Sequence, residues 1–225
     1  MLAAAGCARD EGAVPEPKAA VATAAERPVA AAGEQALPRV LFLGDSLTAG
    51  FGLSEAEAFP ALIDDALRER GWDVDVVNGG VSGDTTAGGL SRLPWLLRQS
   101  PDIVVVELGA NDGLRGLPLA GTAENLGKIV RAAHDAGAEV LLVGMRLPPN
   151  YGATYAQDFE AVFNRIAAEL EVVYMPFLLE DVGGVAELNL PDGIHPNADG
   201  HRIVASNLLP FVEQLLERLE SGAAA

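Results

Sequence analysis

Short apolar runs alternate five times with longer amphipathic stretches after residue 38, and this alternation constrains the fold more than any other feature. The runs are β-branched or aliphatic and are bounded by Gly, Asn or Asp, which is typical of buried parallel strands. They are Arg39–Leu43, Val74–Val77, Ile103–Leu108, Val140–Val143 and Val172–Met175. The stretches with helical periodicity are Phe59–Arg70, Thr86–Arg98, Ala123–Ala136, Tyr155–Leu170 and Ala198–Leu219. This order predicts an α/β fold, a three-layer α/β/α sandwich with a five-stranded parallel sheet and right-handed crossovers.

Residues 1–37 differ in composition from the rest of the chain. Ala, Pro, Glu and Gly dominate this segment, and Phe, Tyr, Trp and Ile are absent from it. Such a segment buries too little apolar surface to offset the entropy of ordering it. We therefore expect a disordered tether over residues 1–37 and one domain over residues 38–220.

The first seven residues contain a candidate signal for lipid attachment. Leu2–Cys7 resembles the end of a bacterial lipoprotein signal, in which small residues precede a cysteine that becomes lipidated. Cys7 is therefore a candidate lipid anchor, and a periplasmic or membrane-anchored location is expected. Only six residues precede Cys7, whereas a signal needs a basic region and an apolar stretch of about 7–15 residues. An ordinary Ala-rich start and a cytoplasmic location stay open as the alternative.

Composition and motif content exclude several classes of function. The 32 acidic and 15 basic residues give a net charge of −17, which argues against a nucleic-acid partner and against docking of the domain on an anionic membrane. One cysteine forms no intrachain disulfide, and metal-ligand spacings are absent, so we expect no metal and no other cofactor. Gly-x-Gly-x-x-Gly and a complete phosphate loop are also missing, as is Gly-x-Ser-x-Gly.

Two polar segments far apart in the sequence together offer a nucleophile and a base. Gly44-Asp45-Ser46 follows the first predicted strand, where a sharp turn presents the serine hydroxyl at the edge of the sheet. Asp192-Gly-Ile-His195-Pro lies in the turn before the last helix, and Asp192 is close enough to orient the imidazole of His195. The alternative for Ser46 is a helix cap or turn residue. For His195 it is a packed or solvated side chain, as we expect for His134 and His201.

Two further strand ends carry groups that stabilise negative charge on an attacked carbonyl oxygen. Asn111, after the third predicted strand, has an amide side chain able to donate a hydrogen bond. The segment 78–85, after the second, has glycines that let a backbone N–H approach a ligand. Ordinary turns and loops remain the alternative for both segments.

These segments resemble, in the same order, the four sequence blocks of the SGNH or GDSL hydrolases. The blocks are Gly44-Asp45-Ser46, Gly83 within Ser-Gly-Asp-Thr, Gly109-Ala-Asn111-Asp112 and Asp192-Gly-Ile-His195. The chain is most similar to the bacterial thioesterase I, protease I and lysophospholipase group, also called arylesterases. The resemblance implies a flavodoxin-like hydrolase fold, no metal, and broad activity on short to medium acyl esters and thioesters. It also implies that Ser46 is the nucleophile, that His195 and Asp192 assist it, and that Gly83, Asn111 and the Ser46 N–H form the oxyanion hole.

Two loops beside this site are expected to form the walls of an acyl groove. They are residues 112–118 and 147–155, which are largely apolar and next to the catalytic blocks. The predicted substrate contacts are Asp112, Leu114, Leu147, Pro148 and Tyr151. We expect a monomeric serine esterase that hydrolyses small acyl or aryl esters, and thioesters, through an acyl-enzyme.

Three other functions stay open from the sequence. A lysophospholipase or long-chain acyl thioesterase would use the same residues on a longer chain. An acyltransferase would pass the acyl group to an alcohol or sugar hydroxyl instead of water. A tethered binding module would keep the fold without the chemistry, although it would have no need of the nucleophile, the base, the acid and two oxyanion donors together.

Overall fold

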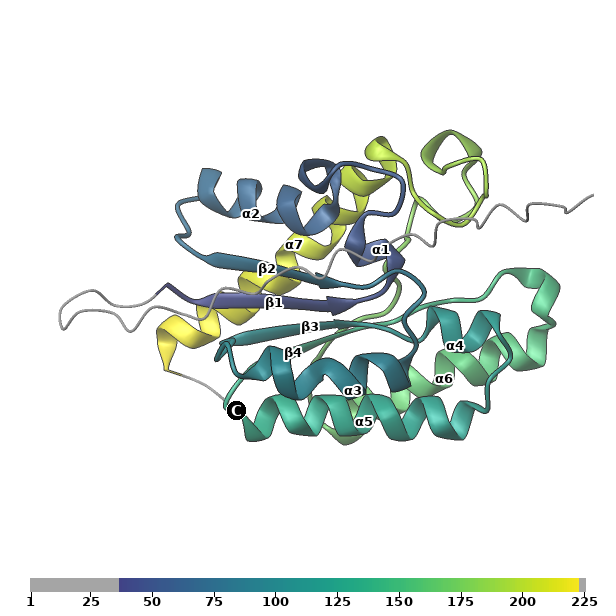
Figure 1. Cartoon of the computed structure of the whole chain (residues 1–225), viewed down its shortest axis with the longest axis horizontal. Helices are drawn as coiled ribbons and strands as arrows, with labels where there is room; N and C mark the ends of the chain where they lie inside the picture. The colour runs from purple at the N-terminus through teal and green to yellow at the C-terminus, as the bar shows by residue number, and fades with distance from the viewer. Residues whose placement is uncertain (1–36, 223–225) are drawn as a thin grey trace, which may run out of the picture.

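The computed structural model describes residues 37–222, in which five parallel strands form one sheet between two layers of helices (Figure 1). The strand order is β2-β1-β3-β4-β5. The strands are β1 (Arg39–Gly44), β2 (Asp75–Gly80), β3 (Ile103–Glu107), β4 (Glu139–Val143) and β5 (Val173–Met175). The predicted α/β sandwich with a five-stranded parallel sheet is therefore confirmed. The candidate anchor Cys7 lies outside the described residues.

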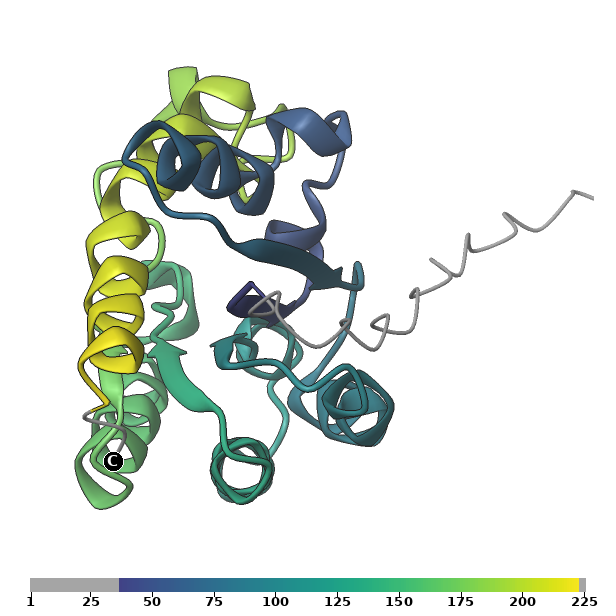
Figure 2. The same ribbon diagram turned by 90° about the vertical axis from the view of Figure 1, so that its left-hand side faces the viewer.

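The longer helices divide between the two faces of the sheet. They are α2 (Phe59–Glu69), α3 (Thr86–Leu97), α5 (Leu119–Asp135), α6 (Ala153–Glu169) and α7 (Ala198–Ser221). Helices α2 and α7 pack together on one face, and α3, α5 and α6 cover the other (Figures 1 and 2). Within residues 37–222, none of the helices has the length and apolarity needed to cross a bilayer.

Aromatic side chains fill the core on both sides of the sheet. Phe42 of β1 meets Phe59 of α2 edge to face, with ring centroids 5.8 Å apart. Phe159 and Phe163 of α6 make a second edge-to-face pair, at 5.2 Å. All four rings are fully buried, and burial of such large apolar surfaces is the main force that holds helices on a sheet.

The end of β2 differs from the sequence-based expectation. The segment 78–80 was expected to be a loop, because Asn and Gly are rare in strands. Instead, Asn78, Gly79 and Gly80 continue the strand and pair with residues 42–44 of β1. Two short helices, α1 (Ser46–Ala49) and α4 (Ala110–Leu114), were not predicted, because four or five residues are too few to show helical periodicity.

The glycines at the end of β2 let α1 pack directly on the strand backbone. A Cβ atom added to Gly80 would lie 2.3 Å from the backbone nitrogen of Ala49. A Cβ atom added to Gly79 would lie 2.7 Å from the carbonyl oxygen of Phe42. Backbone atoms have little freedom to retreat, so α1 occupies its position only because Gly80 lacks a side chain, and Gly79 leaves room for the backbone of β1.

Gly80→Ala is expected to destabilise the domain by about 1–3 kcal/mol, because the added methyl group forces α1 away from β2. Urea unfolding followed by circular dichroism measures this difference. The matched control is Gly121→Ala in α5, where an added Cβ meets nothing within 4 Å and alanine favours the helix. Equal unfolding midpoints for the two variants would contradict the packing argument.

Candidate active site

The predicted functional residues meet at the carboxyl edge of the parallel sheet. Ser46 begins α1 directly after β1, and Asn111 lies in α4 after β3. Gly83 follows β2, and His195 lies in the turn that leads into α7. All four residues line one pocket, as expected for an open parallel sheet whose strand ends share one edge.

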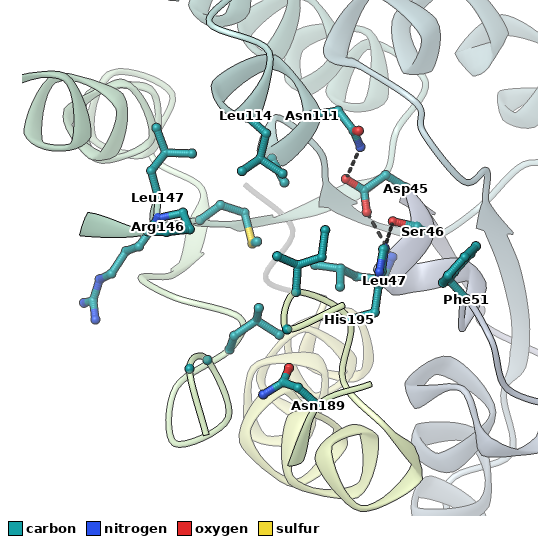
Figure 3. A pocket seen from close by; sticks show the side chains of 18 of the residues that line it. Asp45, Ser46, Leu47, Phe51, Asn111, Leu114, Arg146, Leu147, Asn189 and His195 are labelled. Atoms are coloured by element: carbon teal, nitrogen blue, oxygen red, sulfur yellow. Dashed lines mark hydrogen bonds between the residues drawn. The ribbon is translucent and has the colours of Figure 1, made fainter. Parts of the chain in front are cut away.

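Ser46, His195 and Asp192 form a continuous hydrogen-bonded chain. Nε2 of His195 is 2.9 Å from Oγ of Ser46, as the dashed line between them shows (Figure 3). Nδ1 of His195 is 2.8 Å from Oδ2 of Asp192. The carboxylate therefore holds Nδ1 as the protonated nitrogen and leaves Nε2 free to accept the serine proton.

The turn around Asp192 keeps its carboxyl group ionised. Oδ1 accepts hydrogen bonds from the backbone N–H groups of Ile194 and His195, both at 3.0 Å. The Ile194 N–H and the His195 side chain lower the pKa of Asp192 to about 2. At neutral pH the residue is thus a charged acceptor, which stabilises an imidazolium formed at His195.

Phe51 packs against the imidazole, a contact that the sequence did not reveal. Its ring centroid lies 4.5 Å from that of His195, with the planes inclined by 34°. The side chain stays 47% exposed, so it covers one face of the imidazole at the entrance to the pocket (Figure 3). No motif marks Phe51 in the sequence. The only available signal is its position, five residues after Ser46.

The turn that carries Ser46 is fixed from both ends. The Asp45 carboxylate caps α1 by accepting a hydrogen bond from the Leu47 N–H at 3.0 Å. Gly50 ends the helix with φ of 71°, a left-handed conformation that favours glycine. Ser46 is thereby held at the first position of a one-turn helix.

A buried carboxyl group lies beneath this turn. Glu107, the last residue of β3, is completely buried, and its Oε2 accepts hydrogen bonds from Thr48 Oγ1 at 2.8 Å and from the Asp45 N–H at 3.3 Å. Its Oε1 has no hydrogen-bond partner among the described residues. Burial, together with the Asp45 charge, raises the pKa of Glu107 well above its ordinary value. Burial also raises the pKa of Asp45, to about 6.

Asn111 lines the pocket from α4, and Gly83 lines it from the loop after β2. Nδ2 of Asn111 donates to Oδ2 of Asp45 at 2.9 Å (Figure 3), and a primary amide nitrogen carries a second N–H. Gly83 has φ of 81°, so a side chain at this position would strain the loop. Both residues line the pocket that contains Ser46.

The pocket extends from the catalytic residues into an apolar cavity of about 480 Å³. Leu114 and Leu147 lie on one side of it, with Ser46 and His195 on the other (Figure 3). Its apolar lining includes Phe51, Leu114, Met145, Leu147, Pro148, Pro149, Phe177, Leu179 and Ile194. Among the lining residues outside the two predicted loops, Met145, Phe177 and Leu179 follow β4 and β5 in segments without a recognisable motif.

Two predicted substrate contacts lie outside the lining of this pocket. Asp112 is buried, and its carboxylate accepts hydrogen bonds from the N–H and Oγ1 of Thr86 at 2.8 and 2.6 Å. It therefore ties α4 to the start of α3. Tyr151 supports the pocket from outside, because its hydroxyl donates to the Leu114 carbonyl at 3.0 Å. Leu114, Leu147 and Pro148 do line the cavity.

Among residues 37–222, no cluster of three or more His, Cys, Asp or Glu side chains has the arrangement of a metal site. The hydrogen-bonded chain of Ser46, His195 and Asp192 can support nucleophilic attack by an alcohol with general base assistance by an imidazole.

Comparisons with known proteins point to one family. Residues 42–203 match the model of the GDSL-like Lipase/Acylhydrolase family. An arylesterase of Vibrio mimicus is 45% identical over 186 residues, covering 82% of this chain and 91% of that protein. Thioesterase 1/protease 1/lysophospholipase L1 of Escherichia coli K12 is 43% identical over 178 residues, covering 79% of this chain and 84% of that protein. The crystal structure of the psychrotrophic esterase EstA from Pseudoalteromonas sp., inhibited by monoethylphosphonate, superposes with a TM-score of 0.76 at 34% identity, covering 80% and 98% of the two chains.

Glu107→Gln is expected to become progressively more stable than the parent protein as the pH rises. A carboxyl whose pKa is raised on folding contributes stability below its unfolded value of about 4.3, and this contribution is lost as the pH rises towards the folded value. The difference in unfolding free energy therefore grows above about pH 5, by at most about 1.4 kcal/mol per pH unit. Denaturant unfolding at a series of pH values measures it.

The control for this experiment is Glu69→Gln, which removes an exposed carboxyl at the end of α2. The pH dependence assigned to Glu107 is the part that Glu107→Gln shows and this control does not. A constant difference for Glu107→Gln would mean that Glu107 is ionised in the folded protein.

Proposed function

The chain belongs to the GDSL-like lipase/acylhydrolase family and is a carboxylic ester hydrolase, and we propose that Ser46 is its nucleophile in an acyl-enzyme mechanism. The observation that carries this proposal is the hydrogen-bonded chain from Oγ of Ser46 through His195 to Asp192. An isolated serine hydroxyl is a weak nucleophile, and this arrangement supplies the base and the orienting carboxylate that activate it.

Acylation begins when Oγ of Ser46 attacks the carbonyl carbon of the ester. Nε2 of His195 takes the hydroxyl proton as the new C–O bond forms. It then gives this proton to the leaving group, which is the alcohol oxygen of an ester or the thiol sulfur of a thioester. Asp192 stabilises the imidazolium without taking the proton, in keeping with its lowered pKa. Water then attacks the acyl-enzyme by the same route and releases the acid.

The carbonyl oxygen becomes negatively charged in each tetrahedral intermediate. In our proposal it is bound by the Asn111 amide, the Gly83 N–H and the Ser46 N–H, which belong to residues lining the pocket beside Oγ. Donors fixed in this way stabilise the transition state more than the ground state, and each is worth about 3–4 kcal/mol in comparable sites.

The apolar cavity is the proposed binding site for the acyl chain. Its volume of about 480 Å³ falls in the range typical of small-molecule sites, and Leu114 and Leu147 supply apolar surface to an alkyl chain. We therefore propose short to medium acyl or aryl esters as substrates, with thioesters as a second class. The names of the Vibrio and Escherichia relatives, an arylesterase and a thioesterase/lysophospholipase, support both classes.

Longer acyl chains and acyl transfer are the competing specificities. Lysophospholipase or long-chain thioesterase action would use the same residues on a longer acyl chain, so turnover compared across acyl lengths distinguishes it. Acyl transfer uses the same covalent intermediate, so the yield of new ester in the presence of an added alcohol distinguishes it from hydrolysis.

Ser46→Ala is expected to lower ester hydrolysis by a factor on the order of 10³ or more while the protein stays folded, because the acyl-enzyme has no oxygen on which to form. Turnover of a p-nitrophenyl ester and the far-ultraviolet circular dichroism spectrum measure the two quantities. Ser91→Ala, an exposed serine on α3, is the control and should keep full activity. Retained turnover in Ser46→Ala would overturn the assignment of the nucleophile.

Leu114→Trp is expected to shift the preference towards shorter acyl chains, because the larger ring fills part of the cavity. The ratio of kcat/KM for an octanoate ester to that for an acetate ester should fall by about tenfold, as for the loss of one or two buried methylene groups. Leu117→Trp is the control, since Leu117 is exposed nearby and is absent from the pocket lining. An unchanged ratio in Leu114→Trp would place the acyl chain elsewhere.

A further inference from the structure

One exposed arginine connects the two segments that carry the proposed oxyanion donors, namely helix α4 and the loop after β2. Arg115 caps the C-terminal end of α4. Its Nη2 donates to the Gly83 carbonyl at 2.9 Å and to Oδ1 of Asn111 at 3.2 Å. The contacts join the loop after β2 to the helix after β3. They lie close in sequence to the hydrogen bonds from Thr86 to Asp112, which tie α4 to the start of α3.

We propose that Arg115 is a positioning residue that holds Asn111 and Gly83 in the geometry needed to bind the oxyanion. This inference rests on the proposed function, in which both residues donate to the substrate oxygen. Arg115 is not among the residues that line the pocket, so it acts through Asn111 and Gly83 rather than by touching the substrate.

Arg115 determines which way the amide of Asn111 faces. The guanidinium has hydrogen-bond donors only, so it donates to Oδ1 of Asn111. A flipped amide would turn its NH2 group towards the guanidinium, and two donors would then face each other. On the other side, Asp45 accepts one N–H of Nδ2 at 2.9 Å. With Oδ1 and one N–H occupied in this way, the second N–H of Nδ2 remains for the substrate oxygen.

The charge of Arg115 also strengthens that remaining donor. The guanidinium group is planar and positively charged. Its hydrogen bond draws electron density towards Oδ1 of Asn111, which makes the amide N–H groups better donors. Negative charge on the substrate oxygen is greatest in the transition state, so the effect is expected mainly on kcat.

The same arginine fixes the Gly83 end of its loop. Segment 81–84 closes in a turn in which the Asp84 N–H donates to the Val81 carbonyl at 3.0 Å. Arg92 holds the next residue of the loop, because its Nε donates to the Asp84 carboxylate at 2.7 Å. The hydrogen bond from Arg115 to the Gly83 carbonyl restrains the backbone at Gly83, since glycine by itself is conformationally permissive.

Exposure makes Arg115 suitable for a test of positioning. Arg92 is largely buried and bonded to the carbonyls of Gly79 and Gly44, so its loss would disturb the fold as well as the site. Arg115 is exposed, and removing it leaves no buried group without a partner. A functional effect of its removal is therefore separable from an effect on stability.

The experiment compares Arg115→Ala with Arg98→Ala. Arg98 is an exposed arginine at the C-terminal end of α3. We expect Arg115→Ala to lower kcat for a soluble p-nitrophenyl ester by about tenfold, less than the 10²–10³ lost with a whole oxyanion donor. KM and the thermal unfolding midpoint should match those of Arg98→Ala. The rate of inactivation by a phosphonate ester, which mimics the tetrahedral intermediate, should fall with kcat/KM. Equal kcat in the two variants, or a change confined to KM, would overturn the proposal.

Arg115→Lys separates positioning from charge alone. Lysine keeps the positive charge but lacks the planar group that reaches both oxygens, so it is expected to restore only part of kcat. Full restoration would show that the charge suffices and would overturn the positioning role. Added guanidinium ion, at concentrations below those that unfold the protein, should raise kcat of Arg115→Ala and leave Arg98→Ala unchanged.

These outcomes are distinct from failure of the proposed function. If Ser46 is not the nucleophile, Ser46→Ala keeps its turnover, whatever the arginine variants do. If only the role of Arg115 is wrong, turnover still depends on Ser46 and Arg115→Ala behaves like Arg98→Ala.

Discussion

The site depends on the direct contact between α1 and the backbone of β2. Gly80 leaves no side chain between the two elements, so the first turn after β1 lies close against the edge of the sheet. Ser46 begins that turn, and its position relative to the loops after β2 and β3 follows from this packing. A parallel sheet brings its strand ends to one edge, but the contact at Gly80 determines where on that edge the hydroxyl lies.

The turn is supported from below by groups that have no role in the proposed bond-making steps. Glu107 lies under α1 and binds Thr48 and the Asp45 backbone, and Asp45 in turn accepts a hydrogen bond from Asn111. Both carboxyls are buried, and this exclusion from water raises their pKa values. A rigid, dry support of this kind keeps hydrogen-bond donors oriented before the substrate binds.

The sequence predicted the fold class and the positions of the strands and longer helices, because buried apolar runs and helical periodicity are local signals. It also selected Ser46, His195 and Asn111, which the structure brings to one pocket. It did not reveal Phe51, since nothing local indicates which aromatic ring stacks on an imidazole 144 positions away in the sequence. Asp112 was expected at the groove because it adjoins Asn111, but neighbouring helical residues face different directions, and its carboxylate binds α3 instead.

The most direct test of the account is a crystal structure of the protein after inactivation by a phosphonate ester. The account predicts a covalent bond from phosphorus to Oγ of Ser46. It also predicts that one phosphonyl oxygen lies within hydrogen-bond distance of Nδ2 of Asn111 and of the Gly83 nitrogen, with the alkyl group in the apolar cavity. Phosphorus bound to another residue, or a phosphonyl oxygen directed to solvent away from both donors, would contradict it.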